Sequence, residues 1–244
     1  MGQFDETLGV LLLGIIFNTY LYGIVSYQFA AYWRTPFNDR PTLKVMVLVL
    51  FLLDTVHSAA EIYMAWEYCV TNFNNPSILA EALWPYTFTP PATALAALIT
   101  HTFLGYRVYR LMNNNIYIYG CILVVASASF TLGVYCGTRA WIIRFAAGFD
   151  VLTKPVTAWL SVQAGLDLCI TGLLSFALLR SRTGFRKTDT IVNRLIRGAI
   201  QTGVFAAVFA LGDLVTFIKY PNTNFYGMFA IPVCGNLSLW FVRH

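Results

Sequence analysis

Three ionisable residues, Asp54, His57 and Glu61, stand within a long and largely apolar stretch of the chain. Their spacings of three and four residues place them on one face of a helix. Carboxyl and imidazole groups arranged in this way can donate protons, hold a cation or stabilise positive charge that develops in a reaction. This face is therefore the first place to look for function.

Polar groups recur in other apolar stretches: His101 stands in one, Asp167 follows Gln163 by four residues, and Asp213 stands further on. The carboxyl groups in these apolar stretches outnumber the two histidines, which are the only side chains there that could neutralise them. The carboxyl groups therefore cannot all stay ionised in a low dielectric. The candidate ligand-binding residues are Asp54, His57, Glu61, His101, Asp167 and Asp213.

Depth can be estimated from the helical rise of about 1.5 Å per residue. It predicts one layer near the middle of the membrane that holds Asp54, His57, His101 and Asp167. Glu61 and Asp213 are predicted level with each other in the outer half. For any single residue of this set, a hydrogen bond between helices is the plainer interpretation, worth about 0.6–2 kcal/mol. The face of Asp54, His57 and Glu61 as a whole favours a polar cavity.

The composition explains why these groups are unusual. Hydrophobic residues make up 58% of the 244 residues, and charged residues only 11%. Soluble domains carry about 25% charged residues. The sequence therefore predicts an all-α polytopic membrane protein and excludes nucleic-acid readers, secreted disulfide scaffolds and soluble enzymes.

A membrane-spanning helix needs about 20 mostly apolar residues. We predict seven such helices that together form a single transmembrane domain over residues 1–244. The predicted spans are residues 7–33, 44–70, 87–111, 115–138, 155–179, 190–219 and 222–242. The breaks between them contain turn-forming Asn, Pro and Gly.

Lys and Arg predict the orientation, because they are enriched in cytoplasmic loops. The loops after the first, third and fifth spans and the C-terminus hold 12 of them, against 4 on the other side. The N-terminus is therefore predicted outside and the C-terminus in the cytosol, in the plasma membrane or the endoplasmic reticulum. Within the loop after the fifth span, the residues predicted to contact lipid headgroups are Arg180, Arg182, Arg186 and Lys187.

The sequence predicts no metal site and no cofactor. It contains no CxxC pair, and its three histidines include the last residue of the chain. Cys69 and Cys136 fall at the outer ends of the second and fourth spans, so either a disulfide or two unpaired thiols fits their positions. A retinal protein is excluded, because residues 226–240 contain no lysine for a Schiff base.

The basic segment of residues 179–196, followed by Gln201-Thr-Gly203, resembles the hallmark segment of a basidiomycete family of seven-helix membrane proteins. That family is catalogued only as a domain of unknown function. Asp54 with His57, the sequence of residues 71–73 and Asp167 fit the same pattern. The resemblance implies a fungal seven-helix protein with cytosolic basic loops, but it implies no activity.

Three functions remain open. The first is binding or sensing of an apolar or cationic small molecule in the acidic cavity. The second is an intramembrane enzyme similar to small fungal terpene cyclases, in which Glu61 and Asp213 act as catalytic acids on an isoprenoid substrate. The third is a transporter coupled to protons or cations. The predicted partners are the lipid bilayer and a small ligand, with no nucleic acid.

Overall fold

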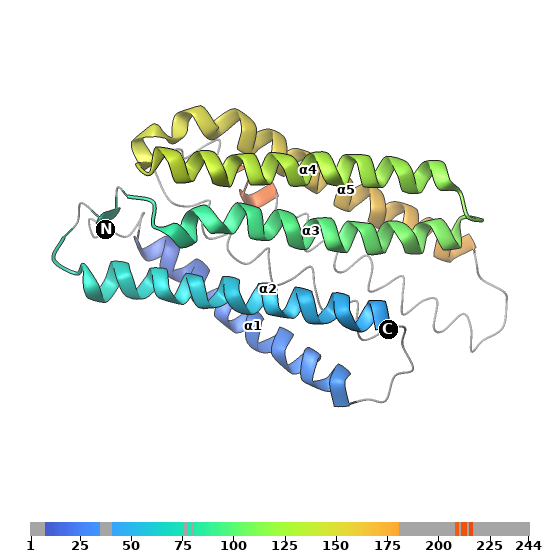
Figure 1. Cartoon of the computed structure of the whole chain (residues 1–244), viewed down its shortest axis with the longest axis horizontal. Coiled ribbons are helices and arrows are strands. Elements are labelled where there is room, and N and C mark those ends of the chain that lie inside the picture. The colour runs from blue at the N-terminus through green and yellow to red at the C-terminus, as the bar shows by residue number, and fades with distance from the viewer. Residues whose placement is uncertain are drawn as a thin grey trace.

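The computed structural model describes residues 8–34, 41–75, 78–79, 81–180, 208–209, 211–213 and 215–216. In this part of the chain the long elements are helices (Figure 1): α1 (Val10–Arg34), α2 (Pro41–Trp66), α3 (Trp84–Leu111), α4 (Ile116–Ile143) and α5 (Thr153–Arg180). A π-helical turn, η2 (Glu67–Thr71), continues α2, and a 3-10 helix, η4 (Ala146–Leu152), precedes α5. The predicted all-α class is confirmed for these residues.

The long helices overlap the first five predicted spans. The short helical pieces within residues 208–216 fall in the sixth predicted span, and the seventh lies outside the described residues. The count of seven helices therefore stays a prediction. By length and composition, α1, α2 with η2, α4 and α5 are long and apolar enough to cross a membrane. These four helices indicate a multi-pass protein embedded in a membrane.

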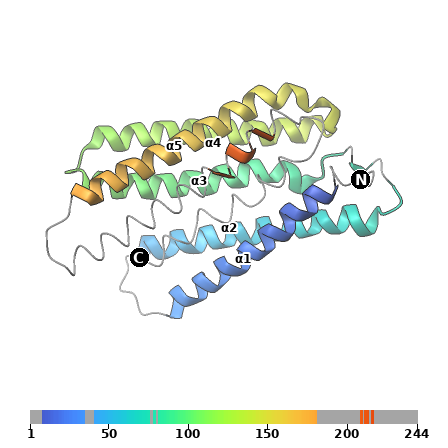
Figure 2. The same cartoon turned by 180° about the vertical axis from the view of Figure 1, so that it is seen from behind.

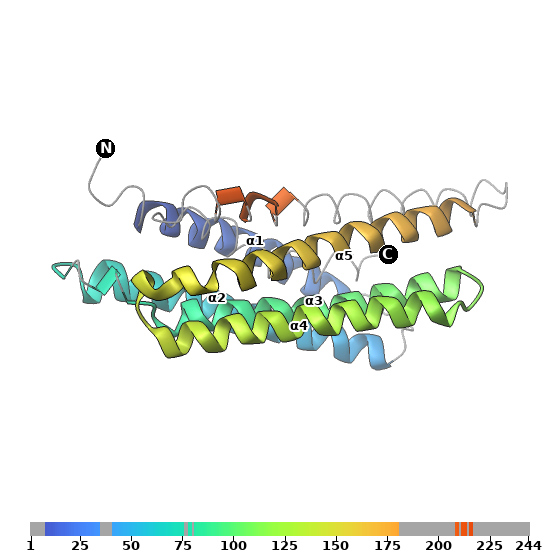
Figure 3. The ribbon, with the colours of Figure 1, turned by 90° about the horizontal axis from the view of Figure 1, so that it is seen from above.

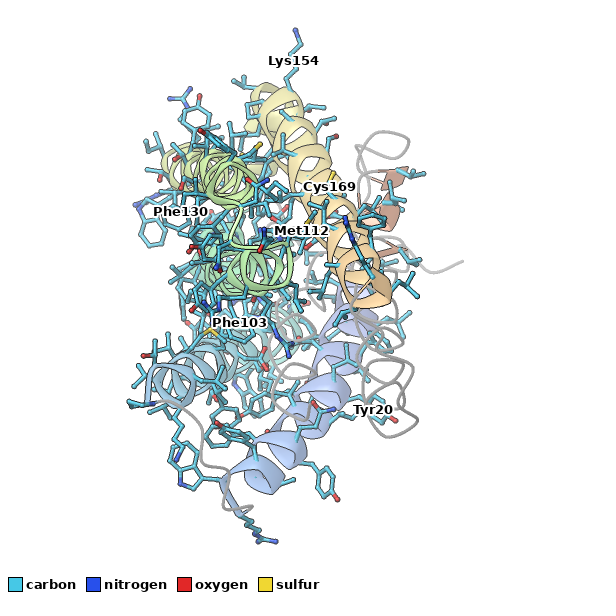
Figure 4. All side chains as sticks on the ribbon, turned by 90° about the vertical axis from the view of Figure 1, so that its right-hand side faces the viewer. Tyr20, Phe103, Met112, Phe130, Lys154 and Cys169 are labelled. Carbon is cyan, nitrogen blue, oxygen red and sulfur yellow. The ribbon has the colours of Figure 1, made fainter. Side chains whose placement is uncertain are left out.

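The helices form two layers. Helices α2, α3 and α4 lie side by side in one layer, and α1 and α5 lie behind them (Figures 1 and 3). Viewed from behind, the described pieces of residues 208–216 lie between α1 and α5, on the outer side of that second layer (Figure 2). The end-on view in Figure 4 shows the same arrangement, with Tyr20 of α1 and Lys154 of α5 extending away from the bundle.

Helix α3 occupies the centre of the bundle, where it packs against α2, α4 and α5. Of the five long helices in the described residues, α3 is also the one that is not apolar enough in composition to be a candidate membrane span. These two facts belong together, because a helix covered by its neighbours need not present an apolar surface to lipid. The central position therefore allows α3 to carry polar side chains such as His101.

Small residues of α4 bring it close to the first half of α3. A Cβ atom on Gly137 would meet the ring of Pro91 at 2.5 Å, and one on Gly133 would meet the Ala94 side chain at 2.5 Å. Close approach of backbones at glycine is the usual device for packing helices in membranes. Pro85 stands in the first turn of α3, where a proline is tolerated, and Pro90 and Pro91 lie inside the helix, with Pro91 packed against Gly137 of α4.

The turn between α3 and α4 is built from asparagines, as the sequence predicts. Asn113 and Asn114 adopt positive φ values of 56° and 58°, which asparagine tolerates better than most residues. The side chain of Asn115 then accepts a hydrogen bond from the backbone N–H of Tyr117 at 3.1 Å and caps α4. These residues reverse the chain within one short turn.

The last turns of α1, α3 and α5 carry Arg34, Arg110 and Arg180. All three helices end on the same side of the bundle, at the right of Figure 1. This is the side that the distribution of Lys and Arg predicts to face the cytosol. Of the residues predicted to contact lipid headgroups, Arg180 lies exposed at the end of α5. Arg182, Arg186 and Lys187 lie outside the described residues.

Candidate functional site

The polar face of α2 is buried in the bundle. The exposed fractions of Asp54, His57 and Glu61 are 2%, 0% and 1%, and Ser58 beside them is buried too. The spacing in the sequence explains this, because residues three and four apart share a helix face, and here that face points inward. We call Asp54, His57, Ser58 and Glu61 the α2 polar face.

Helix α3 contributes a hydroxyl to this face. Thr89 donates a hydrogen bond from Oγ1 to Oε1 of Glu61 at 2.8 Å, and its Oγ1 is also 3.0 Å from the carbonyl oxygen of Pro85. Nε2 of His57 lies 3.5 Å from the same Oε1 of Glu61. One oxygen of Glu61 is therefore in contact with two neighbours, while Oε2 has no hydrogen-bond partner among the described residues.

Helix α1 closes the other side of the α2 polar face. Nδ2 of Asn18 donates a hydrogen bond to Oγ of Ser58 at 3.1 Å. One turn further along α1, the hydroxyl groups of Tyr22 and Thr55 are 3.0 Å apart. These contacts fix α1 against α2 at the level of the polar residues.

Several buried polar atoms around this face have no hydrogen-bond partner in the described part of the chain. Most side-chain hydroxyl groups of the helices do have one, because they donate to the carbonyl four residues earlier, as Thr55 and Thr100 do. On the α2 polar face and on Asn18 these atoms are both oxygens of Asp54, both ring nitrogens of His57, Oε2 of Glu61 and Oδ1 of Asn18. Elsewhere in the described residues they are Oγ1 of Thr93, Nε of Arg139, Nε1 of Trp159, Oε1 of Gln163 and Oγ of Ser175. Open polar atoms of this kind identify a site, since burial without a partner is costly.

Apolar clusters lie on both sides of the α2 polar face along the helix axes. Towards the start of α2, Leu50 packs with Ala96 of α3. Towards its end, Met64 and Tyr68 pack with Leu11 and Ile15 of α1. The α2 polar face is therefore a polar layer that lies between two apolar clusters along the helix axes.

His101 and Asp167 form a second polar group, between α3 and α5. Their Nε2 and Oδ1 atoms are 2.7 Å apart, and both side chains are buried. His101 follows Thr89 by twelve residues, which corresponds to about 18 Å along α3. The structure thus pairs His101 with Asp167 but places the pair well along α3 from the Thr89–Glu61 contact.

Asp213 is also buried, at 6% exposed. It stands one turn after Phe209, whose ring stacks on Phe17 of α1 with the ring centroids 5.9 Å apart. Phe17 directly precedes Asn18, so the helical piece that carries Asp213 lies beside the part of α1 that contacts the α2 polar face. The predicted level arrangement of Asp213 with Glu61 stays a prediction.

Sequence reasoning missed Asn18, Thr89 and Thr93. Asn18 is an amide in an otherwise apolar helix, which is a usable signal. Thr89 and Thr93 gave none, because threonine is common in membrane helices. Tyr63 and Trp66, which a cyclase could use to stabilise cations, are 44% and 61% exposed on the outer surface of α2.

Cys69 and Cys136 are both unpaired, so the disulfide alternative is not realised in the structure. Within the described residues, no group of three or more His, Cys, Asp or Glu side chains is placed to hold a metal ion.

The last third of the chain matches a family of unknown function. The matching family model (DUF6534) covers residues 163–242, from Gln163 in α5 through the basic segment. This agrees with the predicted resemblance to a family of unknown function, while the fungal origin stays a prediction. No curated protein matches the chain, and no solved structure matches it.

Proposed function

We propose that this chain is a multi-pass membrane protein that binds a small molecule at the α2 polar face. The observation that carries the proposal is the set of open polar atoms on Asp54, His57 and Glu61, all buried between α1, α2 and α3. A ligand with complementary hydrogen-bonding groups would satisfy these atoms. The proposal includes the location of the protein, which is the plasma membrane or the membrane of the endoplasmic reticulum.

Energetics favours binding over a purely structural role for this face. Each buried polar group without a partner costs about 1–3 kcal/mol. A residue that only joins helices should have its hydrogen-bonding groups satisfied by the neighbouring helix, as His101 and Asp167 satisfy each other. The open atoms of Asp54 and His57 do not stabilise the bundle, so we assign them a role outside folding.

The test is a ligand screen on the full chain in lipid nanodiscs. The melting temperature would be measured with organic cations, organic anions, polar neutral molecules and isoprenoid alcohols. A ligand at a hundred times its Kd stabilises the folded state by about 2.7 kcal/mol. We therefore expect a rise of several degrees with at least one class.

Glu61→Gln and Glu67→Gln form a matched pair for this screen, since the two acids lie six residues apart on α2 and its continuation. Glu67 is partly exposed and accepts a hydrogen bond from Asn72. The ligand effect should shrink in Glu61→Gln and persist in Glu67→Gln. If no class stabilises the wild-type protein, or both variants respond alike, the proposal fails.

Acid-initiated cyclisation by Glu61 and Asp213 is a second candidate function. It is favoured by the geometry of Glu61, because Thr89 holds Oε1 and leaves Oε2 open to pass a proton to a double bond. The resulting cation would cyclise and lose a proton to a base. The outward position of Tyr63 and Trp66 weighs against it. Microsomes supplied with polyprenylated acceptors should then yield a cyclised product that disappears in Glu61→Gln and Asp213→Asn.

Proton or cation transfer is a third candidate, favoured by the open atoms of Thr93 and Gln163. Gln163 stands one turn of α5 before Asp167, and Thr93 stands one turn of α3 after Thr89. These two open atoms add polar groups on α3 and α5, the helices that also present Thr89 and the His101–Asp167 pair. In liposomes, an unchanged internal pH under an imposed gradient would contradict this candidate.

A further inference from the structure

We infer that the small molecule is an organic cation and that its ammonium group pairs with Asp54, an inference that rests on the proposed function. Both oxygens of Asp54 are buried and have no partner in the described part of the chain. An ionised carboxylate only accepts hydrogen bonds. A ligand group that pairs with the ionised form of Asp54 must therefore be a donor.

The charge of the interior supports a cationic donor over a neutral one. Within the described residues, the buried polar and charged side chains include Asp54, Glu61, Asp167 and Asp213 but no Lys or Arg. The nearest basic residue before Asp54 on α2 is Lys44, at a distance of about 15 Å along the helix. A buried carboxylate is stable only when it is paired with positive charge. An ammonium group of the ligand supplies that charge.

Asp54 is a better partner for this group than Glu61. Oε1 of Glu61 already accepts a hydrogen bond from Thr89 and lies 3.5 Å from Nε2 of His57. Only Oε2 of Glu61 is therefore open, whereas both oxygens of Asp54 are open in the described part of the chain. Asp54 has no such neighbour, so it retains its full capacity to bind a cation.

The apolar clusters on either side of the polar layer favour a ligand with an apolar part beside its charged group. The cluster of Leu50 and Ala96 lies one turn before Asp54, and that of Met64 and Tyr68 lies one turn after Glu61. A ligand held between them would contact apolar side chains outside its charged group, and its charge would act in a medium from which water is largely excluded. An amine with a small alkyl group has this character.

Hexylamine and 1-hexanol are matched probes that differ in charge but not in chain length. Their affinities for the full chain in nanodiscs would be measured by calorimetry, with the melting temperature as a second readout. Hexylamine should bind at least tenfold more tightly than 1-hexanol, which corresponds to about 1.4 kcal/mol. This comparison uses the wild-type protein and does not depend on the folding of a variant.

Three variants locate the effect. Asp54→Asn keeps the size of the side chain but removes its charge, so the affinity for hexylamine should fall at least tenfold. Asp54→Glu keeps the charge and should retain part of the affinity. Glu81→Gln removes an exposed carboxylate from the loop before α3 and should leave the affinity unchanged, which controls for attraction of amines to the protein surface.

The outcomes separate this inference from the proposed function. Binding of 1-hexanol as tight as that of hexylamine, or equal affinity of Asp54→Asn and the wild type for hexylamine, would overturn the inference. So would the absence of any response to hexylamine. If an anionic or neutral class nevertheless stabilises the protein and depends on Glu61, the proposed function stands without the cationic ligand. If no class binds, both are wrong.

Discussion

Two buried groups of histidine and acid lie in this bundle, and they differ in how completely their hydrogen bonds are satisfied. His101 and Asp167 face each other across α3 and α5 at 2.7 Å. His57 and Glu61 lie one turn apart on the same helix, at 3.5 Å, and neither ring nitrogen of His57 has a partner in the described part of the chain. Each group combines a histidine with a carboxylic acid, but one group spans two helices and the other lies on a single helix.

This difference is the one we expect between a structural role and the ligand-binding role that we propose for the α2 polar face. A histidine and an acid on two helices join those helices, because each satisfies the other. A histidine and an acid on one helix do not join two helices through each other; Glu61 contacts α3 through Thr89, but both ring nitrogens of His57 and Oε2 of Glu61 stay buried without a partner in the described residues, which is a cost that folding must bear. Functional sites are the usual reason for such a cost. Exchange of each histidine for phenylalanine, which has a similar shape, tests this interpretation directly.

His101→Phe is expected to have the largest effect on stability. It leaves the carboxyl group of Asp167 buried without its partner, which should cost about 3 kcal/mol of unfolding free energy. The measurement is the free energy of unfolding in detergent micelles. Gln163→Leu, which removes a buried polar side chain without that pairing on the same face of α5, should cost clearly less. A cost of His101→Phe below about 1 kcal/mol would show that the pair is not structural.

Gly137→Ala is expected to have an intermediate effect, centred on the first half of α3. The added Cβ would meet the ring of Pro91 at 2.5 Å and the carbonyl oxygen of Thr87 at 2.9 Å. Overpacking of this kind should cost about 2 kcal/mol. The added Cβ should also displace α3 and so weaken ligand binding. Thr89, two residues before Pro91, donates the hydrogen bond to Glu61 of the α2 polar face.

Gly120→Ala is the matched control, since nothing lies within 4 Å of a Cβ at that position of α4. Alanine there should be neutral or stabilise the helix by up to about 1 kcal/mol. Equal melting temperatures of the two glycine variants would contradict the close packing of α3 and α4 as the support of the α2 polar face.

His57→Phe is expected to have the smallest effect on stability. Neither ring nitrogen of His57 accepts or donates a hydrogen bond within the described residues, so its removal should change the unfolding free energy by less than about 1 kcal/mol. Ligand binding in the nanodisc screen should nevertheless be lost or weakened. A destabilisation as large as that of His101→Phe would remove the distinction between the two polar groups.

Local features of the structure were predictable from the sequence because they depend on neighbours along the chain. The spacing of Asp54, His57 and Glu61 predicted one helix face, and all three are buried together. The three asparagines at 113–115 predicted the turn between α3 and α4, and two of them adopt the positive φ values of such a turn. The apolar stretches predicted the first five helices, within a few residues at most of their ends.

Contacts between helices could not be predicted in the same way. The helical rise per residue predicted that His101 lies near the level of Asp54. It did not predict that His101 pairs with Asp167 or that Glu61 accepts a hydrogen bond from Thr89. Those contacts depend on how each helix is rotated and shifted against its neighbours. A period of 3.6 residues carries no information on that choice.

The sequence by itself thus determined that this protein lies in a membrane, which face of α2 is polar and where α3 turns into α4. Only the tertiary structure decided that α3 is central and which of the polar groups satisfy each other. The physical reason is that burial of apolar surface acts on each helix separately, whereas hydrogen bonds between side chains require two helices to meet at one register. His101 and Asp167 meet in this way, whereas neither oxygen of Asp54 has a hydrogen-bond partner in the described part of the chain.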